Sequence, residues 1–459
     1  MNESEKSSPW PLVTICFGYF MVILDATAVN VALPALMRSL HTTTTSLQWI
    51  VDSYSLVFAA LLLSAGALGD RKGAKGVFLA GIGLFTVSSL ACGLAQSADM
   101  LILARCFQGL GAALAVPTSL SLLQTSYTDR AARARAFGIW GGVAGIAAGA
   151  GPVVGGALVS SLGWQSVFFI NVPIGVIGIV LASHFLSSTQ RYPNGIDLAG
   201  QISGILCLSG ITVALIEAGA MGWASPVVIA GFAVFAVAGG IFIATENQAR
   251  FPMLPLGLFS SANFSTVTVI GLLINFAFYG ELFVMSIYLQ QLRGLTPLSA
   301  GVALLPQMAM AVIGSTLSGR VMVHTGPRLP MLVGLMVGGV GLFGLMATGV
   351  HSTYGLLVIP FFAVGFGMSF TMPAATAAIM QAAPVANGGI ASGVLNSARQ
   401  VGGVIGVALL GTLVVARRSS FMQGLHVGML IAGIAFLLGA VLVWLLVERA
   451  IPEARVNDG

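Results

Sequence analysis

Charged side chains are scarce in this sequence: of its 459 residues, 7% are charged and 57% are hydrophobic. A soluble globular protein carries about 25% charged residues, so this chain has too few charges to cover a surface that faces water. The shortage excludes a cytosolic enzyme, a nucleic-acid-binding protein and a disordered scaffold. The apolar runs are continuous and do not alternate with polar residues, which also excludes a transmembrane β-barrel. The composition predicts an all-α polytopic membrane protein.

Signatures of several other functions are also missing. The four cysteines form no CxxC pair, which indicates neither a disulfide framework nor a zinc site. The five histidines are scattered without an HExxH motif, and the chain has no GxxxxGKS/T loop that would bind ATP. We therefore expect no cofactor and no direct use of ATP. The polar, acidic N-terminus precedes an apolar run that is too long for the core of a signal peptide.

Apolar runs long enough to cross a bilayer recur along the whole chain. A spanning helix needs about 20 mostly apolar residues. About fourteen such spans are predicted, at 11–33, 47–69, 76–97, 100–123, 134–159, 165–187, 196–218, 224–245, 262–291, 298–321, 329–349, 354–379, 388–415 and 424–447.

The distribution of basic residues predicts the orientation of these spans. An even number of spans places both termini on one side of the membrane. With the N-terminus inside, about thirteen Lys and Arg residues fall in inside segments and about four in outside segments, which matches the excess of basic residues in cytoplasmic loops. We therefore expect both termini in the cytoplasm. The net charge of +5 then reflects orientation, and no nucleic-acid partner is expected.

The sequence also contains an internal repeat. Residues 109–117 match 365–373 in a GxGxxxxxP pattern, and 66–75 match 319–328, at offsets of about 256 and 253 residues. Two six-helix halves would repeat at about 200 residues, so about 50 residues are extra, and the two spans in 196–245 supply them. The expected parts are an N-terminal six-helix bundle at 1–190, two extra spans at 191–250 and a C-terminal six-helix bundle at 251–459.

Five motifs, in order along the chain, resemble those of one transporter family. Residues 66–75 are similar to the GxLxDRxGxK signature of the major facilitator superfamily, and 24–34 resemble the helix 1 motif of its fourteen-helix drug:proton antiporters. Residues 103–109 resemble the helix 4 arginine motif, and 149–156 the helix 5 antiporter motif, while 168–175 also match that branch. The resemblance covers essentially the whole chain.

The resemblance implies a major facilitator fold with 6 + 2 + 6 helices. It implies a monomeric secondary transporter rather than an enzyme, one that uses the proton gradient to export lipophilic, cationic drugs or biocides by alternating access. Its expected place is the cytoplasmic membrane of a bacterium, and its expected partners are protons, small lipophilic cations and the bilayer. A dedicated exporter of an endogenous metabolite is the alternative. An intramembrane enzyme or sensor would need a metal cluster or a soluble domain.

Three ionisable residues are candidates for proton coupling. Asp25 stands in an apolar span, where an acid is costly unless it lines a cavity or has a partner, and carboxyl groups removed from water titrate nearer to neutral pH. Asp25 is also a candidate anchor for a cation. Arg105 lies about 9 Å below the outer end of its span, and the resemblance associates it with proton transfer. Glu281 lies in the repeat counterpart of helix 1 and is either a proton or cation site or an acid bonded to a hydroxyl such as that of Tyr279.

Three further charges inside the spans have different expected roles. Asp52 lies about 8 Å below the outer end of its span, so we expect it nearer to water than Asp25, as a fixed charge that binds cationic substrates or as an interfacial acid. The resemblance favours the first role. Glu217 is expected to be solvated. For Arg399 two hypotheses stay open, namely that it neutralises a substrate or that it pins its helix.

Two glycine-containing motifs are expected to act through conformation. Gly66, Asp70, Arg71 and Gly73 lie at a cytoplasmic helix end and are expected to form a conformational latch with nearby helix termini. One departure from the family pattern, Ala74 in place of a basic residue, weakens the charge cluster there.

The second of these motifs is the helix 5 segment. Small residues allow close helix packing, and a proline bends the helix. The resemblance implies that this segment seals one end of the transport pathway, whereas helix packing alone is the alternative. Its residues are Gly151, Pro152, Gly155 and Gly156.

Overall fold

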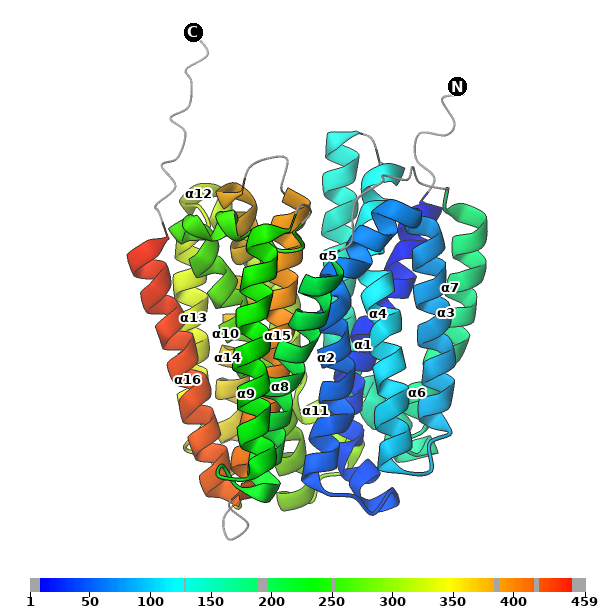
Figure 1. Cartoon of the computed structure of the whole chain (residues 1–459). Coiled ribbons are helices and arrows are strands. Elements are labelled where there is room, and N and C mark those ends of the chain that lie inside the picture. The colour runs from blue at the N-terminus through cyan, green and yellow to red at the C-terminus, as the bar shows by residue number, and fades with distance from the viewer. Residues whose placement is uncertain are drawn as a thin grey trace. The chain divides into compact units, whose positions relative to one another are not determined.

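The computed structural model describes residues 9–127, 129–187, 197–249, 252–383, 388–416 and 421–447. Within these ranges the chain forms helices and no β-strand (Figure 1). The helices are α1 (Trp10–Ser39), α2 (Thr44–Lys72), α3 (Ala74–Gly93), α4 (Ala98–Ser126), α5 (Arg130–Leu162), α6 (Ser166–Phe169), α7 (Asn171–Phe185), α8 (Leu198–Met221), α9 (Pro226–Gln248), η2 (Leu256–Ser260), α10 (Ala262–Ile287), η3 (Tyr288–Leu292), α11 (Pro297–Ala303), α12 (Leu305–Thr325), α13 (Arg328–Leu345), α14 (Gly355–Ala382), α15 (Gly388–Ala416) and α16 (Phe421–Leu446).

Fourteen helical stretches among the described residues are long and apolar enough to cross a membrane, as predicted. Two of them are broken where one continuous helix was expected: α6 and α7 meet at Ile170, and α11 and α12 meet at Leu304. A proline follows each break, Pro173 in the first case and Pro306 in the second. Proline lacks an N–H group, and its ring clashes with the carbonyl four residues earlier, which interrupts each helix.

The chain forms two compact units. The first unit consists of Met1–Met253 together with Ser286–Ala303, and the second of Leu254–Met285 together with Leu304–Gly459. The extra helices α8 and α9 belong to the first unit, where α8 packs against α2. The chain thus passes into the first unit near the end of α10 and leaves it at the break between α11 and α12.

The same turn closes α2 in the first unit and α12 in the second. Gly73 has φ +96° and donates its N–H to the carbonyl of Gly69, and Gly326 has φ +71° and donates to Met322, both at 2.9 Å. Positive φ values are adopted readily only by glycine. The two turns lie 253 residues apart, so the internal repeat predicted from these motifs is confirmed by local structure.

A basic residue that follows each turn binds the carboxyl end of another helix. Lys75 Nζ donates to the carbonyl oxygens of Ser183 and Leu186, at 2.9 and 2.6 Å, at the end of α7. Arg328 donates to the carbonyl of Trp444 near the end of α16. A cation is favourable at a helix C-terminus, so each unit uses its motif to fix a helix end.

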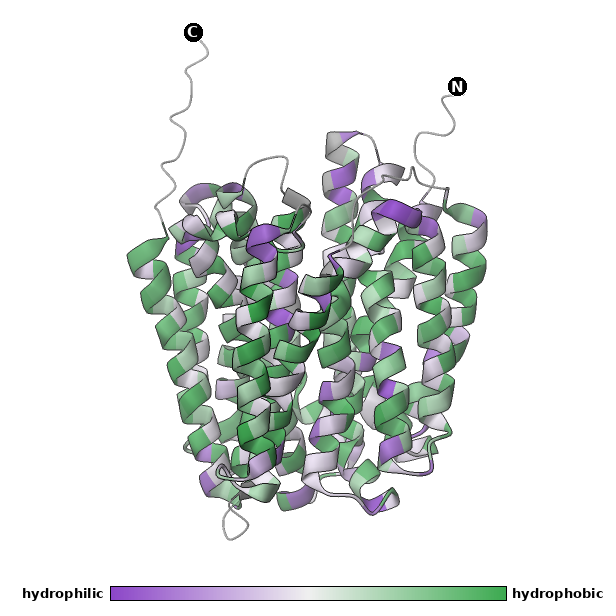
Figure 2. Ribbon diagram, viewed as in Figure 1, coloured by the Kyte–Doolittle hydropathy of each residue, from purple (hydrophilic) through white to green (hydrophobic). Residues whose placement is uncertain are grey.

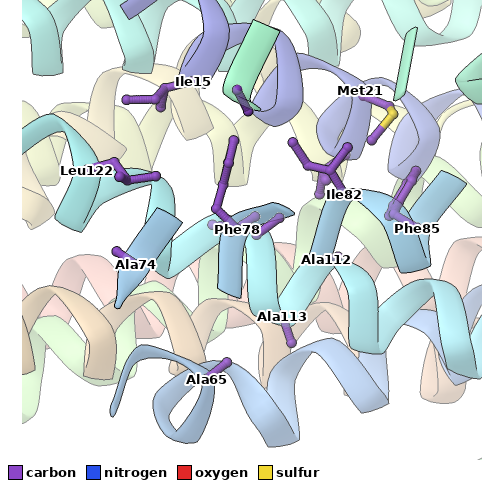
Figure 3. Packing of buried hydrophobic residues seen from close by; sticks show 14 of the residues in the cluster. Ile15, Met21, Ala65, Ala74, Phe78, Ile82, Phe85, Ala112, Ala113 and Leu122 are labelled. Atoms are coloured by element: carbon purple, nitrogen blue, oxygen red, sulfur yellow. The ribbon is translucent and has the colours of Figure 1, made fainter. Parts of the chain in front are cut away.

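The apolar side chains divide into those buried between helices and those exposed on the outside of the helices. In the first unit, Phe78, Ile82 and Phe85 of α3 are fully buried against Ile15 and Met21 of α1 (Figure 3). Other large apolar side chains are exposed on outer faces, and α9 has only 17% of its span buried. Hydrophobic residues cover the middle of the helices, and hydrophilic residues gather toward their ends (Figure 2). Such a surface is suited to lipid as the solvent.

Candidate functional site

The Asp25 carboxylate is 1% exposed and lies in a polar cluster of the first unit. Arg105 Nη1 of α4 lies 2.5 Å from Asp25 Oδ2. Asp25 Oδ1 accepts hydrogen bonds from Gln108 Nε2 of α4 at 3.0 Å and from Asn171 Nδ2 of α7 at 2.8 Å. A buried carboxylate is tolerated when its charge is paired and its lone pairs are satisfied. The structure therefore unites the predicted residues Asp25 and Arg105 and ties α1 to α4 and α7.

The Arg105 guanidinium is equally enclosed. Its Nε donates to the Ile50 carbonyl at 3.0 Å and its Nη1 donates to Gln108 Oε1 at 2.7 Å. Its Cζ lies 4.2 Å from the centre of the Tyr54 ring, a distance at which a cation is attracted to an aromatic face. Arg105 thus has contacts that do not depend on Asp25, and these contacts fasten it to α2.

The contacts of Arg105 divide between two groups of helices. Ile50 and Tyr54 lie on α2 and Gln108 lies on α4, whereas the Asp25 carboxylate belongs to α1. Attraction between opposite charges is strong where water is excluded. The ion pair therefore attaches α1 to a guanidinium that α2 and α4 hold independently.

The second predicted acid, Asp52, is fully buried, contrary to the expectation that it lies nearer to water. Neither of its carboxylate oxygens has a hydrogen-bond partner in the described part of the chain. Depth along the helix axis misled the prediction because α2 is packed between α4 and α8. Glu217 of α8 was expected to be solvated, but it is half-buried and accepts a hydrogen bond from Trp49 Nε1 at 2.9 Å.

Glu281 lies in the second unit, 256 residues after Asp25, and has no exposed surface. Gln307 Nε2 of α12 donates to Glu281 Oε2 at 2.7 Å. The other carboxylate oxygen, Glu281 Oε1, has no hydrogen-bond partner among the described residues. The partner is therefore an amide rather than the expected hydroxyl. Tyr279 instead faces Gly403 of α15, because residues two apart on a helix point in different directions.

The residues expected to form a latch lie in the last turn of α2 and just after it. Asp70 and Arg71 are exposed, and neither forms an ion pair with another described residue. Gly73 ends the helix, and a Cβ on Gly66 would make an ordinary contact with Pro117 of α4 at 3.7 Å. The latch stays a prediction.

The glycines of the helix 5 motif bring α5 close to two other helices of the first unit. A Cβ on Gly155 would lie 2.8 Å from the Ala28 carbonyl oxygen of α1, and one on Gly156 would lie 2.5 Å from the Pro297 carbonyl oxygen of α11. Gly151 packs against Thr27 in the same way, and Pro152 packs against Gly301 of α11. Only glycine fits at such approaches.

Polar contacts extend the same interface along α1. Ser286 Oγ donates to the Asn30 carbonyl at 2.5 Å, and Gln290 Nε2 donates to the Val31 carbonyl at 2.9 Å. We call these contacts, together with those of α11 on α5, the 286–303 contact. Asn30 and Val31 follow Asp25 by about one and a half helical turns, so one helix carries both the ion pair and this contact.

Sequence reasoning assigned no role to several of these residues. Gln108 lies within the 103–109 motif, and its place one turn after Arg105 on the same helix face is a usable signal. Asn171 lies within the 168–175 motif, and its contact with Asp25 joins residues 146 positions apart. For Ser286 and Gln290 the sequence offers no comparable signal.

Comparisons with known proteins agree with this architecture. A model of the Major Facilitator Superfamily matches residues 15–407. The chain is 36% identical to the methylenomycin A resistance protein of Streptomyces coelicolor, covering 97% of this chain and 93% of the relative. It is 38% identical to the tetracenomycin C resistance and export protein of Streptomyces glaucescens, covering 90% of this chain and 77% of the relative.

A solved structure supports the fold at lower identity. The chain is similar to a bacterial homologue of the human lysosomal transporter Spinster, with a TM-score of 0.68 at 16% identity, covering 96% of this chain and 97% of that one. The fold class predicted from the sequence, a polytopic all-α membrane protein with the major facilitator architecture, is confirmed.

Proposed function

The chain belongs to the major facilitator superfamily of transporters, and from this premise we propose that it is a proton-coupled antiporter that exports lipophilic drugs, cations among them. Its proposed place is the cytoplasmic membrane of a bacterium, with both termini inside. The export of drugs is supported by the relatives, which are antibiotic resistance and export proteins. The observation that carries proton coupling is the buried Asp25–Arg105 pair in the middle of an apolar helix.

The proposed coupling runs along α1. With Asp25 ionised, Arg105 holds α1 against α4, and Ser286 and Gln290 stay bonded to α1 a turn further on. Protonation weakens the hold on α1, so the 286–303 contact, at the end that the topology predicts to be outside, opens and re-forms while Asp25 carries the proton. Ionised Asp25 and an intact 286–303 contact belong to the same state, the one that follows proton release to the cytoplasm.

The proton gradient supplies enough free energy for this cycle. One proton is worth about 1.4 kcal/mol per pH unit and about 2.3 kcal/mol per 100 mV of membrane potential. Asp52 is the proposed anchor for cationic cargo, because its buried carboxylate has no hydrogen-bond partner in the described part of the chain and a cation would supply one. Glu281 is the proposed acid of the second unit for a proton or a cation.

Efflux in cells tests this function. An efflux-deficient bacterial host that expresses the chain should extrude ethidium and tolerate a panel of lipophilic drugs, and a protonophore should abolish both effects. Asp25→Asn should abolish them too. The matched control is Asp99→Asn, which removes an exposed acid from the first turn of α4 and should leave efflux unchanged. Efflux that persists with the protonophore would contradict proton coupling.

A dedicated exporter of one compound is the second candidate. The names of the two curated relatives each specify one antibiotic, which favours a narrow range of cargo. The drug panel separates the two functions, because a dedicated exporter would protect against one chemical class only.

A further inference from the structure

Helices α10 and α15 of the second unit approach each other closely. A Cβ on Gly280 of α10 would lie 2.7 Å from the Gly406 carbonyl oxygen of α15. Further along, the Tyr279 ring lies 3.3 Å from a Cβ on Gly403, and the Arg399 Cγ lies 3.3 Å from a Cβ on Gly271. The stem of Arg399 therefore crosses the face of α10 at the level of Gly271, about two turns from Tyr279.

An amide stands between these two levels. Gly271, Asn275 and Tyr279 are spaced by four residues, so they lie along one face of α10. Asn275 has no exposed surface, and neither its Oδ1 nor its Nδ2 has a hydrogen-bond partner in the described part of the chain. A buried amide without partners costs about 1–3 kcal/mol. This cost indicates that Asn275 gains its hydrogen bonds from a ligand or in another conformation of the chain.

The fold itself does not require amides here. In the first unit, the residues 256 positions before Asn275 and Asn396 are Tyr19 of α1 and Trp140 of α5. These two rings stack, with centroids 3.9 Å apart and planes 4° apart. The first unit thus fills the corresponding place with a stacked aromatic pair, and the second unit places two amides there.

The donors of this cluster converge from both helices. Arg399 Nη1 donates to Asn396 Oδ1 at 3.0 Å, and Arg399 lies within electrostatic reach of Tyr279. Arg399, Asn396 and Tyr279 are half-buried, and Asn275, one turn before Tyr279 on the same face of α10, is fully buried. Because Asn396 is on the same helix, one turn earlier, its bond with Arg399 orients the guanidinium relative to α15.

A guanidinium fork, a phenol and an amide N–H group are donors that suit an oxyanion. Arginine matches the planar geometry of a carboxylate with two parallel hydrogen bonds, whereas a cation would be repelled. The cluster lies near the middle of its two spans, Ala262–Leu292 and Ile390–Val414. Transporters hold their substrates near the middle of the bilayer, and a charge inside a span is a functional site by default.

We propose that Arg399, Asn396, Tyr279 and Asn275 form a subsite of the second unit for the carboxylate head group of lipophilic cargo. The proposal rests on the proposed export function, because the subsite serves its cargo. It widens the range from cations to acids and zwitterions: an acidic group binds at Arg399, and the lipophilic body lies against apolar side chains. It assigns Arg399 to substrate recognition, one of the two roles that the sequence leaves open.

Binding of two matched probes to the purified chain in lipid nanodiscs tests the subsite without a proton gradient. 1-Pyrenebutyrate and (1-pyrenebutyl)trimethylammonium share a ring system and a linker but carry opposite charges. Arg399→Gln should weaken binding of the carboxylate at least tenfold and leave binding of the cation unchanged or stronger. Arg399→Lys, which keeps the charge but loses the fork, should show an intermediate loss.

The matched control is Arg320→Gln, which removes an exposed arginine from α12 of the same unit and should change neither affinity. Asn275→Leu replaces the buried amide with an apolar group of similar size. It should preserve folding and lower the affinity for the carboxylate probe severalfold. Unchanged carboxylate affinity in Arg399→Gln, or equal losses for both probes, would overturn the subsite. Failure of export itself would appear separately, as wild-type chain that binds the probes but drives no proton-dependent efflux.

Discussion

The two buried acids of the first unit differ in what surrounds their carboxylates. Asp25 accepts bonds from three side chains on two helices, and Asp52 has no hydrogen-bond partner among the described residues. Removal of a paired charge leaves its partner buried and uncompensated. Removal of an unpartnered polar group removes only a cost. Equivalent substitutions at the two positions therefore have opposite effects on stability.

Leucine substitutions measure this difference directly. Asp25→Leu should lower the free energy of unfolding by about 3–5 kcal/mol, because Arg105 is left without its counter-charge. Asp52→Leu should leave it unchanged or raise it by about 1–3 kcal/mol. Equilibrium unfolding in mixed micelles is the measurement. A large loss of stability in Asp52→Leu would show that its carboxylate has a structural partner.

Transport separates the same two acids in another way. Asp25→Asn should abolish efflux of every substrate, because coupling is lost whatever the cargo. Asp52→Asn should spare some substrates and reduce efflux of a dication more than that of a monocation, since each cargo charge gains from the carboxylate. Efflux of one monovalent and one divalent lipophilic cation should be compared in both variants. Equal losses for the two cations in Asp52→Asn would remove its proposed role as a cation anchor.

At the scale of helices, α5 links α1 to α11 by close backbone approaches. Gly155 faces α1 and Gly156 faces α11, on neighbouring positions of one helix. A side chain larger than hydrogen at Gly156 must push α11 away, and α11 belongs to the 286–303 contact. We therefore expect the motif to control whether that contact forms, whereas helix packing alone would not require this.

Thiol labelling tests this control. Val31 is fully buried, and its carbonyl accepts a bond from Gln290 of the 286–303 contact. In a chain without its native cysteines, Val31→Cys should therefore react slowly with a membrane-impermeant maleimide. Adding Gly156→Val should raise the labelling rate at least fivefold. Gly138→Val is the matched control on α5, because a Cβ there would meet nothing within 4 Å, and it should leave the rate unchanged. Equal labelling rates in the two double variants would contradict the control of the 286–303 contact by Gly156.

The spans were predictable because hydropathy and length alone define them, but their interruptions were not. Ile170 and Leu304 look like any other apolar residue, and each break depends on where a proline falls relative to a packed neighbour. An acidic partner for Arg105 was predictable because Asp25 and Asp52 lie at comparable depth, but depth alone did not choose Asp25. The burial of Asp52 and the isolation of Asn275 were not, because both depend on which helix covers that face.

For the molecule as a whole, the loop charges predict the orientation in the membrane. Single cysteines in place of Lys75 and Arg133 should be labelled only from the cytoplasm, and one in place of Thr43 only from outside. Right-side-out and inside-out vesicles with an impermeant maleimide make the measurement. Labelling of position 43 from the cytoplasmic side would invert the topology.

The central claim is that cargo and protons move in opposite directions through this chain. Purified protein in liposomes that contain a pH-sensitive dye, with the membrane potential clamped by valinomycin and potassium, tests it most directly. When ethidium is added outside, its uptake should raise the lumen pH in proportion in the wild type and in Asp99→Asn, and Asp25→Asn should show no such rise. Ethidium uptake by the wild type without a change in lumen pH would contradict the account.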